Sequence, residues 1–157
     1  MAGLVTLLLT GYHCFLWTGE MMNLRRGDVQ CNEEGKAISI KLEFTKGTAR
    51  RGGTEFIRID DDLVQAVLGK LCDSRMPGDL LVPMTIANFY SFFRVMVQSL
   101  DLVDLNIKAY SVRRGGATWA FQYHNCLPHT LERGRWQHAK TARVYLTEGL
   151  WHGRVPP

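Results

Sequence analysis

An apolar segment near the N-terminus limits most strongly what this chain can fold into. Residues 4–16 carry apolar side chains on almost every face of a helix, which is typical of a helix enclosed by other elements. The chain has 157 residues and is 46% hydrophobic, enough to supply that cover within one domain. The apolar run meets Tyr12 and His13, far short of the roughly 20 apolar residues that cross a membrane. We therefore expect a buried helix and no membrane contact.

The remaining pattern predicts a mostly helical α+β fold with one small three-stranded antiparallel sheet. Strand-like stretches of alternating or β-branched residues cover 28–31, 37–44 and 55–59, with turn signals between them. Further helices are expected at 20–24, from the aspartates at 60–62 to about 72, at 86–100, 111–123, 127–135 and 141–148.

Two of these helices carry a more specific signal. Thr85 can cap the helix at 86–100, and its apolar stripe predicts one buried face formed by Ile86, Phe89, Tyr90, Phe93, Val97 and Leu100. In the helix at 111–123, the small residues Gly115, Gly116 and Ala117 permit close packing against a neighbour.

Charge and cysteine content leave several classes of function open. The formal net charge of +4 and the pI near 9.0 make a polyanion a reasonable partner, although many proteins with such a charge never bind nucleic acid. The four cysteines form no CxxC pair, so we expect reduced thiols in an intracellular protein. His124, Cys126, His129 and His138 match no zinc spacing, and we expect no metal site.

Two C-terminal motifs carry the chemistry. Residues 110–118 read Tyr-Ser-Val-Arg-Arg-Gly-Gly-Ala-Thr, and residues 133–136 read Arg-Gly-Arg-Trp, with Tyr145 nine positions after Trp136. Together they resemble the second half of the tyrosine recombinase, or phage integrase, signature, in which a His-x-x-Arg box precedes a His or Trp and then a nucleophilic tyrosine. The resemblance implies the catalytic-domain fold of that family.

The N-terminal half of the chain resembles the rest of the signature. The family's first box is an Arg-x-x-Glu helix that leads into the sheet, and aligning Glu20 places Trp17 where the arginine belongs. Lys46 stands in the hairpin between the second and third strands, where the family has its catalytic lysine. The likeness spans residues 1–157. We expect a single catalytic domain that lacks its N-terminal part and the N-terminal domain that clamps DNA in such enzymes.

The resemblance assigns roles that suit phosphodiester cleavage. Tyr145 would attack the phosphorus and form a 3′-phosphotyrosine, while Lys46 would protonate the departing 5′ oxygen. Arg113 would bind two non-bridging oxygens, and Trp136 would donate one indole N–H. The covalent link conserves the bond energy, so no metal or other cofactor is expected.

Two departures weaken this enzymatic interpretation. Tyr110 stands where the family usually has histidine, and a phenol is poorly matched to base chemistry near pH 7. Trp17 cannot supply a cationic fork, and a comparable arginine in phosphoryl transfer is worth about 10³–10⁵ in rate. The sequence therefore predicts an impaired site-specific recombinase. A catalytically inactive DNA-binding module or mobile-element relic is the alternative, and a type IB topoisomerase is a lesser one.

Duplex DNA is the expected partner. We expect its phosphates to be contacted by Arg50, Arg51, Arg135 and Arg143 in addition to Lys46 and Arg113. The free protein is expected to be a monomer that can self-associate on DNA. Its expected location is with DNA inside the cell, in the nucleus of a eukaryote or the nucleoid of a prokaryote.

Overall fold

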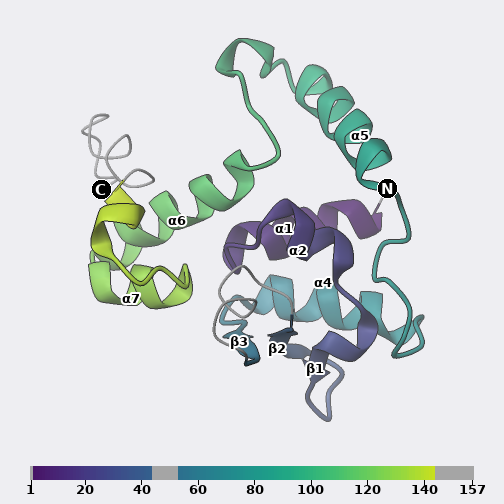
Figure 1. Ribbon diagram of the computed structural model, residues 1–157. Helices are drawn as coiled ribbons and strands as arrows, with labels where there is room; N and C mark the ends of the chain where they lie inside the picture. Colours follow the sequence, from purple (N-terminus) through teal and green to yellow (C-terminus); the bar gives the residue numbers. More distant parts are fainter. Residues whose placement is uncertain (1, 44–52, 144–157) are drawn as a thin grey trace.

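The N-terminal helix α1 (Ala2–His13) forms the centre of the fold. The computed structural model describes residues 2–43 and 53–143. On one side α1 packs against α4 (Asp62–Asp73), which in turn covers the sheet, and on another it packs against α6 (Ser111–His124) (Figure 1). Leu7, near the middle of α1, is fully buried. The expectation of an internal helix is confirmed.

The predicted end of this helix at residue 16 is wrong. The amide of Leu16 still donates to the Gly11 carbonyl at 2.9 Å, but Phe15 has a φ of 48°. A left-handed residue cannot continue a right-handed helix, so the chain turns sharply after His13. Continuous apolar character hid this turn, because Phe15 and Leu16 are buried for tertiary reasons.

The sheet has the predicted composition and direction. Its strands β1 (Val29–Cys31), β2 (Ala37–Leu42) and β3 (Glu55–Arg58) pair antiparallel in the order β1-β2-β3. The strands are slightly shorter than expected: residue 28 ends the 3-10 turn η1 (Arg26–Asp28), and residue 44 lies outside the described residues. Residues 44–52 of the connection between β2 and β3, Lys46 among them, likewise lie outside the described residues.

Side-chain caps start two helices where the sequence predicts. The Asp61 carboxylate accepts from the Val64 amide at 2.9 Å at the start of α4. The Thr85 hydroxyl accepts from the Asn88 amide at 3.2 Å at the start of α5 (Ile86–Ser99). Each cap satisfies one backbone donor that the first helical turn leaves without a partner.

The buried stripe of α5 is narrower than predicted. Phe89, Phe93 and Val97 are buried, whereas Ile86, Tyr90 and Leu100 are at least half exposed. Helix α5 stands apart from the sheet and reaches the core along one side only (Figure 1). A periodicity of 3.6 residues identifies the apolar face of a helix, but it does not tell how much of that face the neighbouring elements cover.

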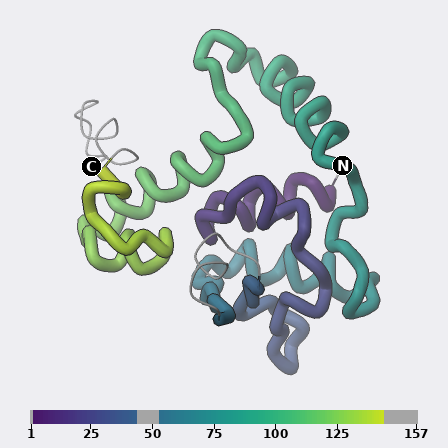
Figure 2. Tube along the Cα trace, in the orientation of Figure 1, coloured from purple at the N-terminus to yellow at the C-terminus, as the bar shows by residue number. Residues whose placement is uncertain are grey.

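The C-terminal half forms a second layer on α1. From α5 the chain passes through the short turn η2 (Val103–Leu105) into α6 and then into α7 (Leu127–Arg133), as Figure 2 traces. Helix α7 ends two residues before the predicted boundary at Arg135, which has a φ of 58°. Residues 139–143 are helical, and the rest of the helix predicted at 141–148 lies outside the described residues.

The short helix expected at 20–24 is α2 (Thr18–Asn23).

Within residues 2–43 and 53–143, none of the helices has the length and apolar character needed to cross a membrane.

Close approach between α1 and α6 depends on Gly116. A Cβ added there would overlap the backbone oxygen of Tyr12 and lie 3.2 Å from the Phe15 ring. The predicted role of small residues in helix packing is thereby confirmed.

Replacing Gly116 by alanine should destabilise the domain by about 3 kcal/mol, because a backbone oxygen cannot rotate away as a side chain can. Gly19→Ala is the matched control, since no atom lies within 4 Å of its added Cβ and alanine favours a helix by up to about 1 kcal/mol. Urea unfolding midpoints of the two variants measure the difference. Equal midpoints would contradict the close packing of α1 on α6.

Thiol reactivity provides a second check of the packing. Burial raises the pKa of Cys14 to about 12 and that of Cys72 to about 12, so neither thiol supplies thiolate at pH 8. Cys126 is exposed. In a timed reaction with a chromogenic disulfide reagent at pH 8, Cys126 should react first, and Cys14 and Cys72 only after denaturant is added. Rapid labelling of Cys14 in the native protein would contradict the packing around the end of α1.

Candidate functional site

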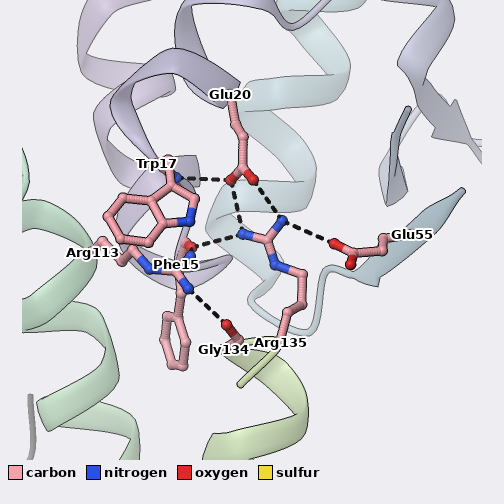
Figure 3. A network of polar contacts seen from close by, with 7 residues as sticks. All are labelled: Phe15, Trp17, Glu20, Glu55, Arg113, Gly134 and Arg135. Atoms are coloured by element: carbon pink, nitrogen blue, oxygen red, sulfur yellow. Dashed lines mark hydrogen bonds and ion pairs between the residues drawn. The ribbon is translucent and has the colours of Figure 1, made fainter. Parts of the chain in front are cut away.

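The described residues bring four of the predicted site residues together. Trp17 precedes α2, Arg113 lies on α6 and Arg135 follows α7 (Figure 3). Trp136 is the next residue, and its ring contacts Arg113. Tyr110 stands just before α6 and is 48% exposed. Arg143 is exposed farther along the chain. The predicted residues Lys46, Arg50, Arg51 and Tyr145 lie outside the described residues.

The guanidinium of Arg113 is held inside the protein. Arg113 is only 3% exposed, and its Nη1 donates to the Phe15 carbonyl. Nη2 donates to the Gly134 carbonyl at 2.7 Å. Two of the nitrogens that the resemblance assigns to phosphate oxygens are thus bound to backbone oxygens.

Two indole rings lie against the same guanidinium. The Arg113 Cζ atom is 4.4 Å from the centre of the Trp17 ring and 5.1 Å from that of Trp136. A desolvated cation on an indole face is stabilised by about 2 kcal/mol or more. Trp17 is 38% exposed, so its ring covers Arg113 on the solvent side and separates the cation from an approaching ligand.

The end of α1 explains why arginines gather here. The last carbonyls of a helix have no partner within the helix and carry partial negative charge. Here the His13 carbonyl accepts from Arg133 Nε at 2.8 Å, and the Phe15 carbonyl accepts from Arg113 and, at 3.1 Å, from Arg135 Nη2. The left-handed Phe15 places its carbonyl within reach of both guanidinium groups.

Arg135 forms a partly buried ion-pair network. Its two terminal nitrogens donate to the two carboxylate oxygens of Glu20, at 2.9 and 2.8 Å, and Nη1 lies 3.4 Å from Glu55 (Figure 3). The side chains of Arg135 and Glu20 are 13% and 8% exposed. Such forked pairing is strong, and it neutralises the positive charge that the sequence suggested for DNA.

Glu20 also fixes the position of Trp17. Its Oε2 accepts from the Trp17 backbone amide at 2.8 Å, which caps the first turn of α2. The Glu20 carboxylate therefore orients Trp17, which contacts Arg113, and it also binds Arg135.

Sequence reasoning missed Arg133 and the pairing of Glu20 and Glu55 with Arg135; Glu20 entered it only as the acidic residue of the first box. Arg133 bonds to Asp60 at 2.5 Å in addition to the His13 carbonyl, and Glu20 and Glu55 bind Arg135. The Arg-x-Arg pattern at 133–135 was the only available signal. Its partners lie between 73 and 120 residues away in the sequence, where no local pattern can identify them.

A metal centre is not formed by the described residues: they contain no cluster of three or more His, Cys, Asp or Glu side chains that could hold an ion. The described site therefore offers arginine, tryptophan and carboxylate groups. The guanidinium groups of Arg113 and Arg135 already donate to backbone carbonyls and to Glu20.

No family model matches the chain, and no curated protein matches it. Among solved structures, it is similar to XerH site-specific recombinase bound to palindromic difH substrate in a post-cleavage complex, with a TM-score of 0.72 and 16% sequence identity. That match covers 96% of this chain and 44% of the other. A pre-cleavage complex of XerH with difH substrate gives a TM-score of 0.68 and 18% identity, covering 92% and 42%.

The chain spans less than half the length of these solved proteins. At such low identity the likeness concerns architecture. The central helix, the three-stranded sheet and the α6–α7 layer give this chain the tyrosine recombinase catalytic-domain fold.

Proposed function

We propose that this domain binds duplex DNA and that its strand-cleavage chemistry is suppressed. The reason is that the Arg113 guanidinium lies against the Trp17 indole and donates hydrogen bonds to two backbone carbonyls. The buried state of that guanidinium, 3% exposed between two indoles, is the observation that carries the proposal. Support for DNA as the partner comes from the fold, since the XerH structures of the same fold contain difH substrate, and from the net charge of +4.

Cleavage would require a cationic pocket around the scissile phosphate. Negative charge builds on the non-bridging oxygens during in-line attack, and pre-positioned cations stabilise it. Tyr145 would be the nucleophile, Lys46 the proton donor, and Arg113 with Trp136 the phosphate ligands. Phosphate could reach Arg113 only if Trp17 moved and the guanidinium left the Phe15 and Gly134 carbonyls.

Arg135 does not replace the missing arginine. Its guanidinium donates to the same Phe15 carbonyl as Arg113 and is therefore close to the pocket. Glu20 and Glu55 offset its charge, however, and two carboxylates beside a phosphate would oppose the charge that cleavage generates.

The second candidate is an active recombinase that forms a 3′-phosphotyrosine. The order of Lys46, Arg113, Trp136 and Tyr145 in the sequence favours it, and the covering of Arg113 by Trp17 disfavours it. A change at residue 17 therefore distinguishes the two candidates.

Binding to duplex DNA should weaken as salt is added, and the slope of log K against log salt reports the number of phosphates that the protein contacts. Lys46, Arg50, Arg51 and Arg143 are the four proposed phosphate contacts, and Arg113 and Arg135 are not counted because their guanidinium groups bind groups inside the protein. Four phosphate contacts give a slope of about −3 to −4 for log K against log salt. Fluorescence anisotropy with a labelled duplex between low and moderate salt measures it.

Two variants calibrate this slope. Arg143→Ala should make it less steep by about one, whereas Lys36→Ala, at an exposed lysine paired with Glu34, should leave it unchanged. A slope near zero would remove DNA from the possible partners. A slope steeper than about −5 would mean that Arg113 and Arg135 also release their internal partners to bind phosphate.

Restoring arginine at position 17 should increase covalent trapping of DNA. On a nicked suicide substrate, Trp17→Arg uncovers Arg113 and adds a second cation, so adduct should form faster by up to about 10³–10⁵. The gain will be smaller if neighbours have repacked around the indole. Tyr110→His should help less. Denaturing gels of the protein–DNA adduct provide the readout.

Matched variants make this test specific. Trp119→Arg changes another exposed tryptophan, 41% exposed on α6, and should give no gain. Adding Tyr145→Phe to Trp17→Arg should abolish the adduct, because the attacking oxygen is removed. Native protein that cleaves as fast as Trp17→Arg would refute the inhibitory role of Trp17.

A further inference from the structure

A groove of about 830 Å³ lies beside the covered arginine. Its walls come from α2, the segment leading to η1, the end of β2, α5 and the residue before α6. Three exposed aromatic side chains line it: Trp17, Tyr90 and Tyr110, which are 38%, 50% and 48% exposed. We refer to it as the aromatic groove.

The charges in the aromatic groove do not suit a phosphate. Glu20 and Asp28 contribute carboxylates to its lining. The one arginine of the lining, Arg25, donates its guanidinium to the Gly78 carbonyl. A phosphate would thus meet the Asp28 carboxylate, since both Glu20 oxygens are bound by Arg135, whereas a neutral planar ring would meet aromatic side chains.

Aromatic side chains of this kind bind nucleobases by stacking. Every base has a π face, and stacking on an aromatic residue contributes about 1–3 kcal/mol per base. The groove exceeds the volume of a single base, and it adjoins the position of Arg113, where the resemblance places the DNA backbone. A nucleotide whose phosphate stays outside can therefore place its base inside.

We propose that the aromatic groove binds an unpaired nucleobase, so that the domain prefers DNA carrying an extrahelical nucleotide over fully paired duplex. The inference rests on the proposed function in that DNA is the partner. The inference adds a class of ligand, DNA with an extrahelical nucleotide, which the burial of Arg113 does not by itself suggest.

The polar lining favours bases with an exocyclic amino group. Asp28 and Asn23 offer oxygen acceptors in the groove, although Asp28 Oδ2 already accepts from the Arg25 amide at 2.8 Å. Carboxylates accept from the N4 amino group of cytosine, whereas thymine presents an acceptor at that position. Cytosine should therefore bind better than thymine, although the two rings are similar in size.

The test compares three labelled duplexes that differ only at their centre: fully paired, with one extrahelical cytosine, and with one extrahelical thymine. Fluorescence anisotropy of the whole chain at constant salt gives each Kd. The duplex with extrahelical cytosine should bind about fivefold or more tightly than the paired one, with the thymine duplex between them. An extrahelical base is already unpaired, so little unpairing energy opposes its binding.

Variants of the groove identify the stacking residues. Tyr90→Ala and Tyr110→Ala should each remove most of the advantage of the extrahelical cytosine, while Tyr90→Phe and Tyr110→Phe should retain it because the ring remains. Tyr123→Ala is the matched control, since Tyr123 is 72% exposed on α6 and does not line the groove. The ratio of the two Kd values separates stacking from a general loss of fold.

The outcomes distinguish the two proposals. Equal binding of all three duplexes, or an advantage unaffected by Tyr90→Ala and Tyr110→Ala, would overturn the aromatic groove as a base site while leaving DNA binding intact. No binding of any duplex would refute the proposed function itself. An advantage for thymine over cytosine would overturn the assignment of Asp28 and Asn23.

Discussion

The backbone carbonyl of Phe15 is the acceptor on which the arrangement of the site depends. It lies just beyond the end of α1 and accepts from Arg113 on α6 and from Arg135 after α7. Arg133 binds the carbonyl of His13 two residues earlier. A helix C-terminus attracts cations, and three arginines from the C-terminal half satisfy that attraction, thereby joining the two halves of the domain. In the proposed function these contacts give Arg113 and Arg135 a structural role, whereas the sequence pattern suggests that both bind phosphate.

In the proposed function, Trp17 affects the site by more than the absence of one charge. The centre of the Trp17 ring lies 4.4 Å from the Arg113 Cζ atom, at a place where a second arginine would repel the guanidinium unless an anion were bound between them. Without that repulsion Arg113 is compatible with its buried position, in which the Trp136 ring centre lies 5.1 Å from Cζ. The exposed part of Trp17 then becomes a wall of the aromatic groove. Trp17 therefore contributes both to the covering of the cation and, with Tyr90 and Tyr110, to the aromatic surface beside it.

The sequence predicted the elements well and the orientation of site residues poorly. Thr85 and Asp61 begin their helices as expected, because capping depends on residues within one turn. The resemblance to the tyrosine recombinase signature also implied that Trp17, Arg113 and Trp136 lie in one cluster, as they do. The partners of Arg113 could not be predicted, since Phe15 is 98 residues away and adopts a left-handed conformation that its side chain does not favour. The exposure of Tyr90 likewise depends on how far α5 stands from the core.

The arginine contacts at the end of α1 also bear on the order in which the domain assembles. They join residues 98 and 120 positions apart, and such non-local contacts slow folding because a long loop must close first. During synthesis α1, α4 and the sheet emerge first and are available to pack, but the His13 carbonyl lacks Arg133, and the Phe15 carbonyl lacks Arg135, until α7 and the residues after it have been made. The turn after α1 is thus completed by residues about 120 positions later, and a nascent domain reaches its final form only after Arg133 and Arg135 have left the ribosome.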